Sequence, residues 1–514
     1  MAGVLPKGFR LYLGPGVIVP PAVDVWYPRG PGYDADPFRG RVVVARLRRD
    51  VPLDTARAAV DALAARLVAD HPSSYRTGAV RLSVSPLDED VVRDVKPALT
   101  AVAGAVAFVL LVACANLTNL LLARASARSR EMAMRLSIGA SRRHIVGQLA
   151  AEGLLVGGLG AIGGLLLAGW IVHGLLLLAP ATLPQREAIT MDATVAGFAV
   201  ITSLVCALVV SLVPAWHATT SDIGAVLKED PASSRSGNGM RGLLAAGQLA
   251  LSLVLLIGAG LMARAFISLR SVPLGFTPDR AVTMGIALQG QPFNRGTLEE
   301  ARARRLVFYH QLAGAVRQIP GVEEAGLGLP VPLRGMSIVQ RFSTGVGEPE
   351  RQAEAVIALA GFLDALRVPL AAGRYFTTAD DAQPVVMVDQ RLADELWPRQ
   401  SALGRQLVLL SPVSAPRSVE VVGVVAHART QSLRSPGLPQ IWVSYASKSY
   451  TGLDLVVRGP NPLTFVPAVK EAVQRLGAGR PVHDIRLLSD YVADASADTR
   501  FALFVLGAFA VLSM

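Results

Sequence analysis

The sequence predicts a membrane-spanning α-helical bundle combined with external α+β domains. The chain of 514 residues has a mean hydropathy of +0.43, yet 17% of its residues are charged. Four uncharged runs each exceed the roughly 20 apolar residues that a bilayer crossing needs. Between and beside these runs lie two long polar regions with the patterns of strands and amphipathic helices. A disordered chain would not carry this much apolar sequence.

The four uncharged runs are predicted to form transmembrane helices. We expect these helices over about 97–123, 150–179, 193–216 and 242–264. A further apolar run over 500–514 begins like a transmembrane helix but ends with the chain. It is too short to cross a bilayer, so we expect the start of a truncated helix there.

The short loops between the runs predict the orientation in the membrane. Residues 124–148 carry six Arg against one Glu, and residues 217–241 carry three Lys or Arg. Because cytoplasmic loops are rich in Lys and Arg, both loops are predicted to be cytoplasmic. The polar regions 1–95 and 265–499 are then external. The basic loops on the cytoplasmic side of the membrane thereby account for the net charge of +11, and no nucleic-acid partner is expected.

Each external region shows short strands and helices. In the first, we expect a strand over 41–47 and a helix over 53–67; in the second, a helix over 304–319. Further strands of the second region are expected over 355–359, 385–388, 419–425, 441–443 and 453–457. The acidic pairs and triplets, such as Asp380 with Asp381, are expected in solvated turns. Both regions end in the order strand, Pro-Leu turn, helix, strand, membrane run, which predicts a duplicated module.

A stretch at the first cytoplasmic loop carries a family resemblance. Residues 110–155 read LLVACANLTNLLLARASARSREMAMRLSIGASRRHIVGQLAAEGLL, and residues 212–228 read LVPAWHATTSDIGAVLK. In the second external region, VVMVDQRLADELW (385–397) and VVGVVAH (421–427) add to the pattern. Together these segments resemble ABC transporter permeases of the FtsX/MacB type, particularly the duplicated permeases called acidobacterial. The resemblance covers nearly the whole chain and identifies it as a fragment of such a permease.

The resemblance implies a domain order. Residues 1–95 would be the C-terminal part of a first MacB-like periplasmic domain, and 96–217 an FtsX-like permease domain with three transmembrane helices. A cytoplasmic linker (218–241), a fourth helix (242–264) and a second MacB-like periplasmic core domain (265–499) would follow.

The resemblance also implies where a cytoplasmic ATPase docks. In such permeases the basic helix between the first two membrane helices contacts the ATPase. The residues that match this ATPase-coupling pattern are Arg130, Glu131, Arg135, Gly139, Ala140, Arg142 and Arg143. We expect Arg135 and its neighbours to form ion pairs with an acidic ATPase surface. The alternative is that these arginines only set the topology and contact lipid head groups.

The sequence contains no motif for nucleotide-phosphate binding, metal binding or catalysis. No GxxxxGK[ST] phosphate-binding loop occurs, so we expect no cofactor on this chain and ATP hydrolysis by a separate ABC-type ATPase subunit. The seven histidines form no HExxH pattern, and no catalytic or metal-binding residues are expected. We therefore do not expect an enzyme.

Four glycines in the second run predict close helix packing. Gly153, Gly157, Gly160 and Gly164 form two pairs with the spacing small-xxx-small. Packing within one bundle is favoured over a seam between two permease copies.

The sequence thus predicts a multi-pass permease subunit in a bacterial inner (plasma) membrane. It would couple a cytoplasmic ATPase to movement of periplasmic domains for export or extraction of a substrate. The alternative is an FtsX-like regulatory protein that transmits the ATPase state to an external partner without transport. Membrane lipid and an ATPase are the expected partners, with a second permease copy and a periplasmic partner as further candidates.

Overall fold

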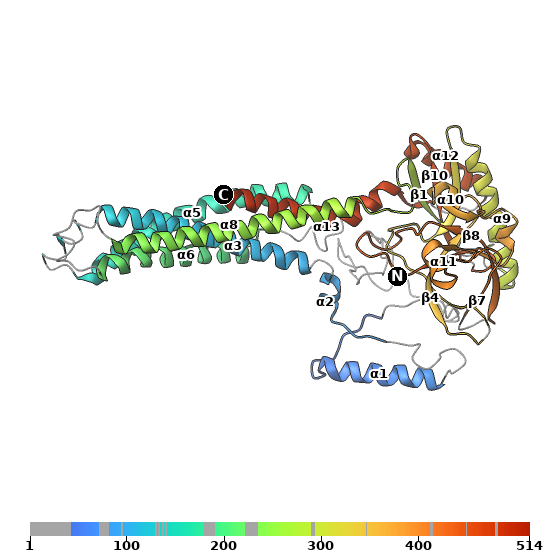
Figure 1. Cartoon of the computed structure of the whole chain (residues 1–514), viewed down its shortest axis with the longest axis horizontal. Coiled ribbons are helices and arrows are strands. Elements are labelled where there is room, and N and C mark those ends of the chain that lie inside the picture. The colour runs from blue at the N-terminus through green and yellow to red at the C-terminus, as the bar shows by residue number, and fades with distance from the viewer. Residues whose placement is uncertain are drawn as a thin grey trace, which may run out of the picture. The chain divides into compact units, whose positions relative to one another are not determined.

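The computed structural model divides the chain into two compact units, which we describe separately (Figure 1). One unit comprises Val95–Arg270 with Ser496–Met514, and the other Met1–Asp94 with Ser271–Ala495. The structure describes residues 43–70, 82–93, 96–128, 131, 134–135, 138, 141–178, 191–220, 235–288, 293, 295–345, 347–411, 415–448, 450–477 and 482–513.

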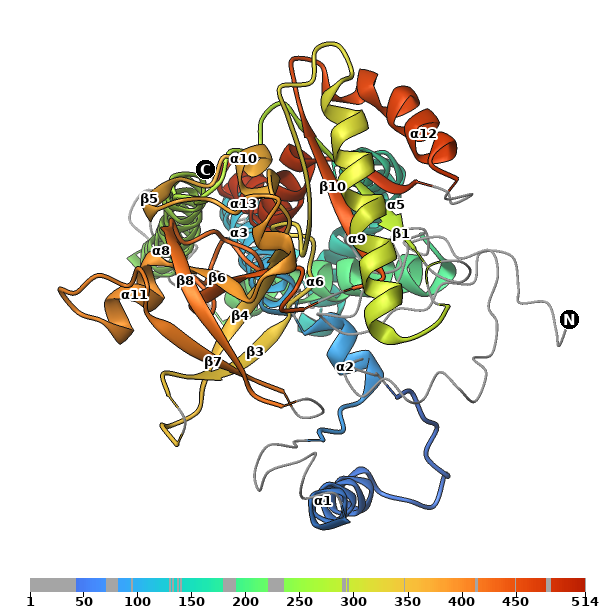
Figure 2. The same cartoon turned by 90° about the vertical axis from the view of Figure 1, so that its right-hand side faces the viewer.

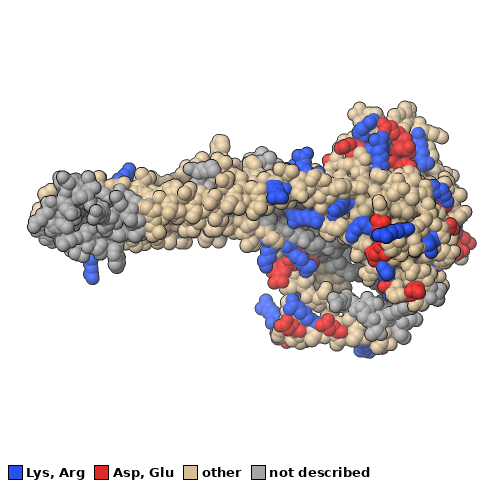
Figure 3. All heavy atoms as spheres, in the orientation of Figure 1, with Lys and Arg blue, Asp and Glu red and all other residues tan. Residues whose placement is uncertain are grey.

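The first unit is a bundle of long apolar helices. Its helices are α3 (Lys96–Ala127), α5 (Arg142–Leu178), α6 (Ala193–Thr220), α8 (Arg235–Arg270) and the second part of α13 (Leu488–Ser513). Four of them, all except α13, are long and apolar enough to cross a membrane. On the face that Figure 3 shows, the described residues of this unit carry few charged side chains along most of its length. Such a surface suits contact with lipid.

Two of the four glycines on α5 pack against α6. A Cβ atom added to Gly153 would lie 2.7 Å from Cβ of Ser211, and one added to Gly157 would overlap Cβ of Ala207. Gly160 and Gly164 would meet nothing within 4 Å. The first pair therefore serves packing within the bundle, as small residues do when helix backbones approach closely.

The second unit contains a ferredoxin-like sheet. Its elements are β1 (Ala281–Ala287), α9 (Leu298–Arg317), β2 (Glu324–Leu329), β10 (Gly452–Arg458), α12 (Val466–Arg475) and β11 (His483–Leu487). The strand order is β11-β1-β10-β2, and all three pairings are antiparallel. This is the order of two βαβ units joined in one sheet. Helix α9 packs against β2 and α12, runs in front of the sheet in the view of Figure 2, and begins with a capping box formed by Thr297 and Glu300.

A six-stranded barrel is inserted between β2 and β10. Its strands are β3 (Val339–Ser343), β4 (Arg351–Ala358), β6 (Val385–Asp389), β7 (Gln406–Leu410), β8 (Arg417–Val425) and β9 (Gln440–Ser444). The pairings run β4-β3-β7-β8-β6-β9, and β9 pairs with β4 to close the ring. Strand β5 (Leu370–Gly373) adds to β8, and β2 pairs with β4, which joins the barrel to the ferredoxin-like sheet. The helices α10 (Phe362–Leu366) and α11 (Gln390–Leu396) connect barrel strands.

The predicted helix and strands of the second external region are confirmed. Helix α9 covers most of 304–319. Strands β6, β8, β9 and β10 contain the expected strands, and β4 covers 355–358 of the strand expected over 355–359. The expectation for Asp380 and Asp381 was wrong. Both lie in the 3-10 turn η3 (Asp380–Ala382) and are 3% and 0% exposed, because each carboxylate is hydrogen-bonded inside the domain.

The N-terminal region departs from the expected strand. Residues 43–47 form no strand, and Val43 and Val44 are exposed; residues 41 and 42 lie outside the described part. The predicted helix is present as α1 (Leu53–Asp70), and α2 (Leu87–Val92) follows it. The corresponding strand β10 is held between β1 and β2, whereas the described N-terminal residues include no such neighbours. Without a neighbouring strand, the backbone groups of a strand remain unpaired.

Candidate functional site

The loop after α3 is tied to the first turns of α5. Nη2 of Arg135 lies 2.5 Å from Oε1 of Glu131, and Nη1 donates to Oε1 of Gln148 at 3.2 Å. Arg128, just past the end of α3, lies 3.8 Å from Glu152 of α5. These contacts hold the described part of the loop against α5, although each exposed ion pair contributes only about 0–1 kcal/mol.

The structure describes part of the predicted coupling residues. Glu131 and Arg135 form the ion pair just given, and Arg143 is exposed in the first turn of α5. Arg142 begins α5, but its side chain lies outside the described part. Arg130, Gly139 and Ala140 also lie outside the described residues.

The segment between α8 and β1, residues 271–280, is held by backbone contacts to the external domain. We call it the entry segment. The amide of Thr277 donates to the carbonyl of Leu366 at 2.9 Å, and the carbonyl of Leu274 accepts from the amide of Arg429 at 2.8 Å. Gly275 has a φ of +73°, and a Cβ atom there would overlap the carbonyl oxygen of His427. Only glycine fits this close approach without strain.

Arg458 binds the entry segment from below the surface. Its side chain, 1% exposed, donates to the carbonyls of Ala365 (2.7 Å), Asp279 (2.5 Å) and Thr277 (2.5 Å). Burial lowers the pKa of the guanidinium to about 10, so it remains charged at neutral pH. All three hydrogen-bond acceptors of the guanidinium are backbone carbonyls and none is a carboxylate. Arg458 therefore holds the backbone of the entry segment in place.

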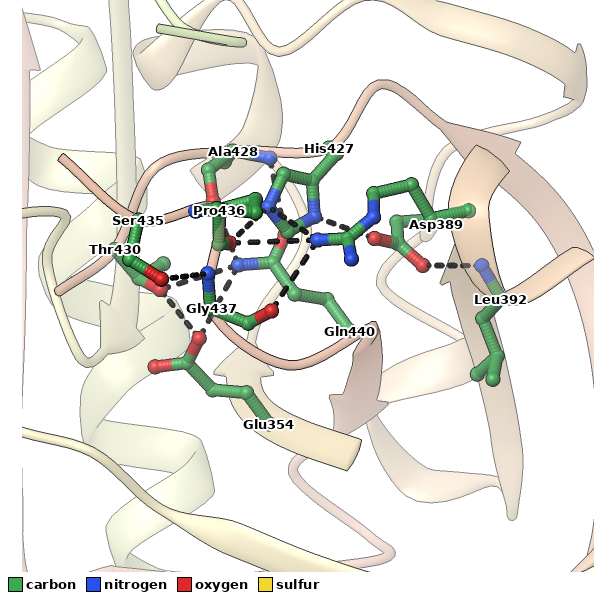
Figure 4. Close-up of polar contacts among 11 residues, drawn as sticks. Glu354, Asp389, Leu392, His427, Ala428, Thr430, Ser435, Pro436, Gly437 and Gln440 are labelled. Atoms are coloured by element: carbon green, nitrogen blue, oxygen red, sulfur yellow. Dashed lines mark hydrogen bonds and ion pairs between the residues drawn. The ribbon is translucent and has the colours of Figure 1, made fainter. Parts of the chain in front are cut away.

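The loop after β8 is held by a second polar network, which Figure 4 shows. Nδ1 of His427 lies 2.5 Å from Oδ2 of Asp389, and Nε2 lies 2.5 Å from the carbonyl oxygen of Pro436. The other carboxylate oxygen of Asp389 accepts from the amide of Leu392 at 2.9 Å and caps α11. Asp389 and His427 belong to the two segments 385–397 and 421–427 singled out in the sequence, and the fold brings them into contact.

A buried carboxylate fixes the middle of the same loop. Glu354 on β4 is fully buried and accepts from the hydroxyl of Thr430, from Nε2 of Gln431 (3.2 Å) and from Nε2 of Gln440 (3.4 Å). Gln440 also donates to the carbonyl of Ala428 at 2.7 Å. Buried polar groups require such partners, so this network holds the loop that contacts the entry segment.

The exit from the external domain is held by charged side chains. Arg334 forms ion pairs with Asp454 on β10 and with Asp484 on β11, the second at 2.7 Å. Near the end of β11, Arg486 lies 2.5 Å from Asp494 and 4.5 Å from the ring centre of Tyr491. We call residues 488–495 the exit segment.

Entry and exit meet at one corner of the sheet. Val282, near the start of β1, pairs with Leu487, the last residue of β11, and Arg458 lies opposite Ala281 on the other side of β1. Sequence reasoning missed Arg458. The only hint in the sequence is that Arg458 ends the largely apolar segment LDLVVR. This pattern does not predict a buried arginine until the neighbouring strand and the backbone carbonyls beside it are known.

Among the described residues, no group of three or more His, Cys, Asp or Glu could hold a metal ion. The carboxylates of Asp389 and Glu354 are bound by a histidine ring, a threonine hydroxyl, side-chain amides and a backbone amide. Their chemistry is that of holding segments in place.

Two family models match the chain. Residues 103–223 match the FtsX-like permease C-terminal domain, and residues 244–476 match the MacB-like periplasmic core domain. With its apolar bundle and sheet-rich external domain, the chain is therefore an ABC-type membrane permease of the FtsX/MacB kind. Proteins of these families are not themselves enzymes and imply an ABC-type ATPase as partner.

Solved structures include two distant likenesses. One is the extracellular domain of the noncanonic ABC-type transporter YknZ from Gram-positive bacteria, at 16% identity and a TM-score of 0.26, covering 40% of this chain and 100% of that one. The other is the periplasmic region of MacB from Actinobacillus actinomycetemcomitans, at 14% identity and a TM-score of 0.29, covering 43% and 95%. No curated protein matches the chain significantly.

Proposed function

We propose that this chain is the permease subunit through which a separate cytoplasmic ATPase moves the external domain. The observation that carries the proposal is the sheet corner at Val282 and Leu487. Both connections to the membrane helices reach the external domain there, and Arg458 and Arg334 fix the backbone on either side. A displacement of α8 or α13 would therefore move the sheet directly, because the connecting segments are fixed to it.

The proposal assigns the cytoplasmic end to the loop between α3 and α5. Arg135 is already paired with Glu131 and Gln148, so the loop would meet the ATPase as a fixed surface. The exposed Arg143 and the partly exposed Arg135 supply positive charge for an acidic groove. ATP would be bound and hydrolysed on the partner, since this chain has no phosphate-binding loop.

The proposal places the chain in a bacterial inner membrane as a multi-pass protein. The external domain would then work on a substrate on the periplasmic side, by export or by extraction. Antimicrobial compounds, peptides and lipoproteins are the candidate substrates by analogy with the family, and the described residues do not select among them.

A pull-down from native membranes tests the coupling. The tagged full chain is purified in detergent and the eluate is assayed for ATPase activity, comparing wild type with Arg135→Glu plus Arg143→Glu. The matched control is Arg351→Glu, which breaks an exposed ion pair with Glu395 in the external domain. We expect ATPase activity with wild type and the control, and a loss of about tenfold or more with the double variant, because two attractive charge pairs become repulsive.

A second readout separates transport from regulation. The complex is reconstituted in vesicles, and movement of peptide and lipophilic probes is followed with ATP. ATPase association without any ATP-dependent movement would favour the regulatory alternative. Equal ATPase recovery with all variants would exclude the loop between α3 and α5 as the docking surface.

A further inference from the structure

Four basic side chains gather around the turn that follows β9, residues 445–448. Arg417, at the start of β8, donates from Nη1 to the carbonyl of Ala446 at 2.6 Å. Lys448 lies in the turn itself and donates to Oε1 of Gln340 at 3.2 Å. Arg302 and Arg305 lie one helical turn apart on α9 and so share a face of that helix.

An edge-to-face contact between two aromatic rings brings this face of α9 to the turn. The ring of Tyr309, one turn beyond Arg305 on α9, lies edge-on to the ring of Tyr445 with centroids 5.8 Å apart. Arg305 is hydrogen-bonded to the Tyr445 side chain, whose hydroxyl donates to the carbonyl of Tyr450 at 3.0 Å. Arg302 is close enough to Arg417 to be repelled by its charge.

The positive charge of this cluster is not balanced. The ion pairs of the described residues include none to Arg302, Arg417 or Lys448, and Glu299 is the acidic group that attracts Arg302. Burial, together with the charges of Arg417 and Arg305, lowers the pKa of Arg302. Burial also lowers the pKa of Lys448 to about 8. Like charges at short range destabilise each other unless a counter-charge is present.

The cluster extends from the interior to the surface. Arg305 is 4% exposed, Arg302 and Lys448 are half-buried, and Arg417 is exposed. At the buried end, the hydroxyl of Tyr309 is fully buried and has no hydrogen-bond partner among the described residues. A buried polar group without a partner is rare and calls for one. An anion with several oxygen atoms would supply acceptors to both ends of the cluster.

We propose that Arg302, Arg305, Arg417, Lys448 and Tyr309 form an oxyanion-binding site that takes a carboxylate or a phosphate group. Guanidinium groups bind both chemistries through paired hydrogen bonds, and a buried arginine strengthens the interaction. The site lies within the external domain and is independent of ATPase coupling.

Thermal unfolding of the full chain tests the site directly. The protein is kept in nonionic detergent at pH 7 and constant ionic strength, and chloride is replaced by inorganic phosphate or by succinate. The variants are Arg302→Gln and Arg417→Gln. The matched control is Arg351→Gln, whose exposed partner Glu395 lies in the same domain.

Two results are expected. In chloride, Arg302→Gln should melt about 2–4 °C above wild type, because the substitution removes a repelled, half-buried charge. About 10 mM phosphate or succinate should raise the melting temperature of wild type and of the control. Its apparent affinity for Arg302→Gln and Arg417→Gln should fall about tenfold or more, as the loss of one charge-assisted hydrogen bond predicts.

A response to phosphate alone would assign a phosphate group, and a response to succinate alone a carboxylate; either supports the site. The proposal is overturned if neither anion stabilises wild type beyond chloride. It is also overturned if Arg302→Gln melts below wild type in chloride, which would make Arg302 a structural residue, or if both site variants respond to the anions as the control does.

Discussion

Arg458 of β10 donates a hydrogen bond to the carbonyl oxygen of Thr277 in the entry segment, with the two atoms 2.5 Å apart. The same guanidinium binds the carbonyls of Asp279 and Ala365, so one buried side chain ties the entry segment to the end of α10. The position of the entry segment therefore depends on a residue about 180 positions further along the chain.

Replacement of Arg458 should release the entry segment. Arg458→Met keeps the apolar stem but leaves three carbonyls without their donor, at a cost of about 3 kcal/mol or more. Amide hydrogen exchange of the full chain in detergent should then speed up at Thr277, whose amide bonds Leu366. Arg351→Met, which loses an exposed ion pair, is the control and should leave exchange at Thr277 unchanged. Unchanged exchange in Arg458→Met would show that the hydrogen bonds of Arg458 are dispensable.

The two pairs of glycines on α5 should respond differently to the same substitution. Gly157→Leu places a side chain where Ala207 of α6 already packs and should cost about 1–3 kcal/mol or force the helices apart. Gly160→Leu projects into open space and should be neutral or slightly stabilising, since leucine favours helix. Thermal unfolding in detergent measures both. A loss on Gly160→Leu as large as that on Gly157→Leu would point to a further helix packed on that face.

Acid should weaken the external domain partly through Asp380. Two hydrogen bonds from Arg374 are the main cause that lowers the pKa of Asp380 from 3.8 to about 2. Because the folded pKa is below the unfolded value, the stabilisation is present above about pH 4 and is lost as the pH falls towards 2. Since Arg374 is half-exposed, we expect about 1–2 kcal/mol.

Asp380→Asn should therefore lower the melting temperature at pH 6 but hardly change it near pH 2. The neighbouring Asp381 provides a contrast, because burial raises its pKa despite hydrogen bonds from His310 and Ala360. Its contribution has the opposite sign and favours the folded state as the pH falls through the raised value. Equal pH profiles for wild type and Asp380→Asn would contradict the assignment.

Lys448 should destabilise the domain at neutral pH. Burial lowers its pKa from 10.5 to about 8, so the unfolded chain binds more protons between these values. Stability should consequently rise as the pH increases from about 8 to about 10. Lys448→Met should increase the free energy of unfolding by about 1–3 kcal/mol at pH 7, and by less at pH 10, which thermal unfolding at the two pH values measures. A lower melting temperature at both values would mean that the hydrogen bond to Gln340 outweighs the burial of the charge.

The extent of sequence prediction differed between the two units. The four apolar helices follow from length and composition alone, because a bilayer imposes both. Helix α9 and strands such as β6 and β9 follow from periodicity and short apolar runs. The first two strands of the ferredoxin-like sheet, β1 and β2, escaped because AVTMGIA and EAGLGL contain glycines that weaken the strand pattern.

The polar contacts were harder to predict than the elements. Asp380 and Asp381 look like a solvated turn. Their burial is explained by Arg374, six residues before Asp380, and by His310, which is 71 residues before Asp381. Asp389 and His427 were each within a recognised segment, but their contact depends on the parallel pairing of β6 with β8. Long-range pairing of this kind leaves no local signal in one sequence.

The corner where β1 and β11 pair also determines which loads the external domain can bear. The two strands are antiparallel and Val282 lies opposite Leu487, so both chain connections leave from the same end of the pair. A force that draws the two connections apart would open the ladder like a zipper, one hydrogen bond after another. A force that acts on both in the same direction puts no tension across the ladder. Under the coupling proposed above, this pairing would let the external domain follow membrane helices that move together, and it would open when they separate.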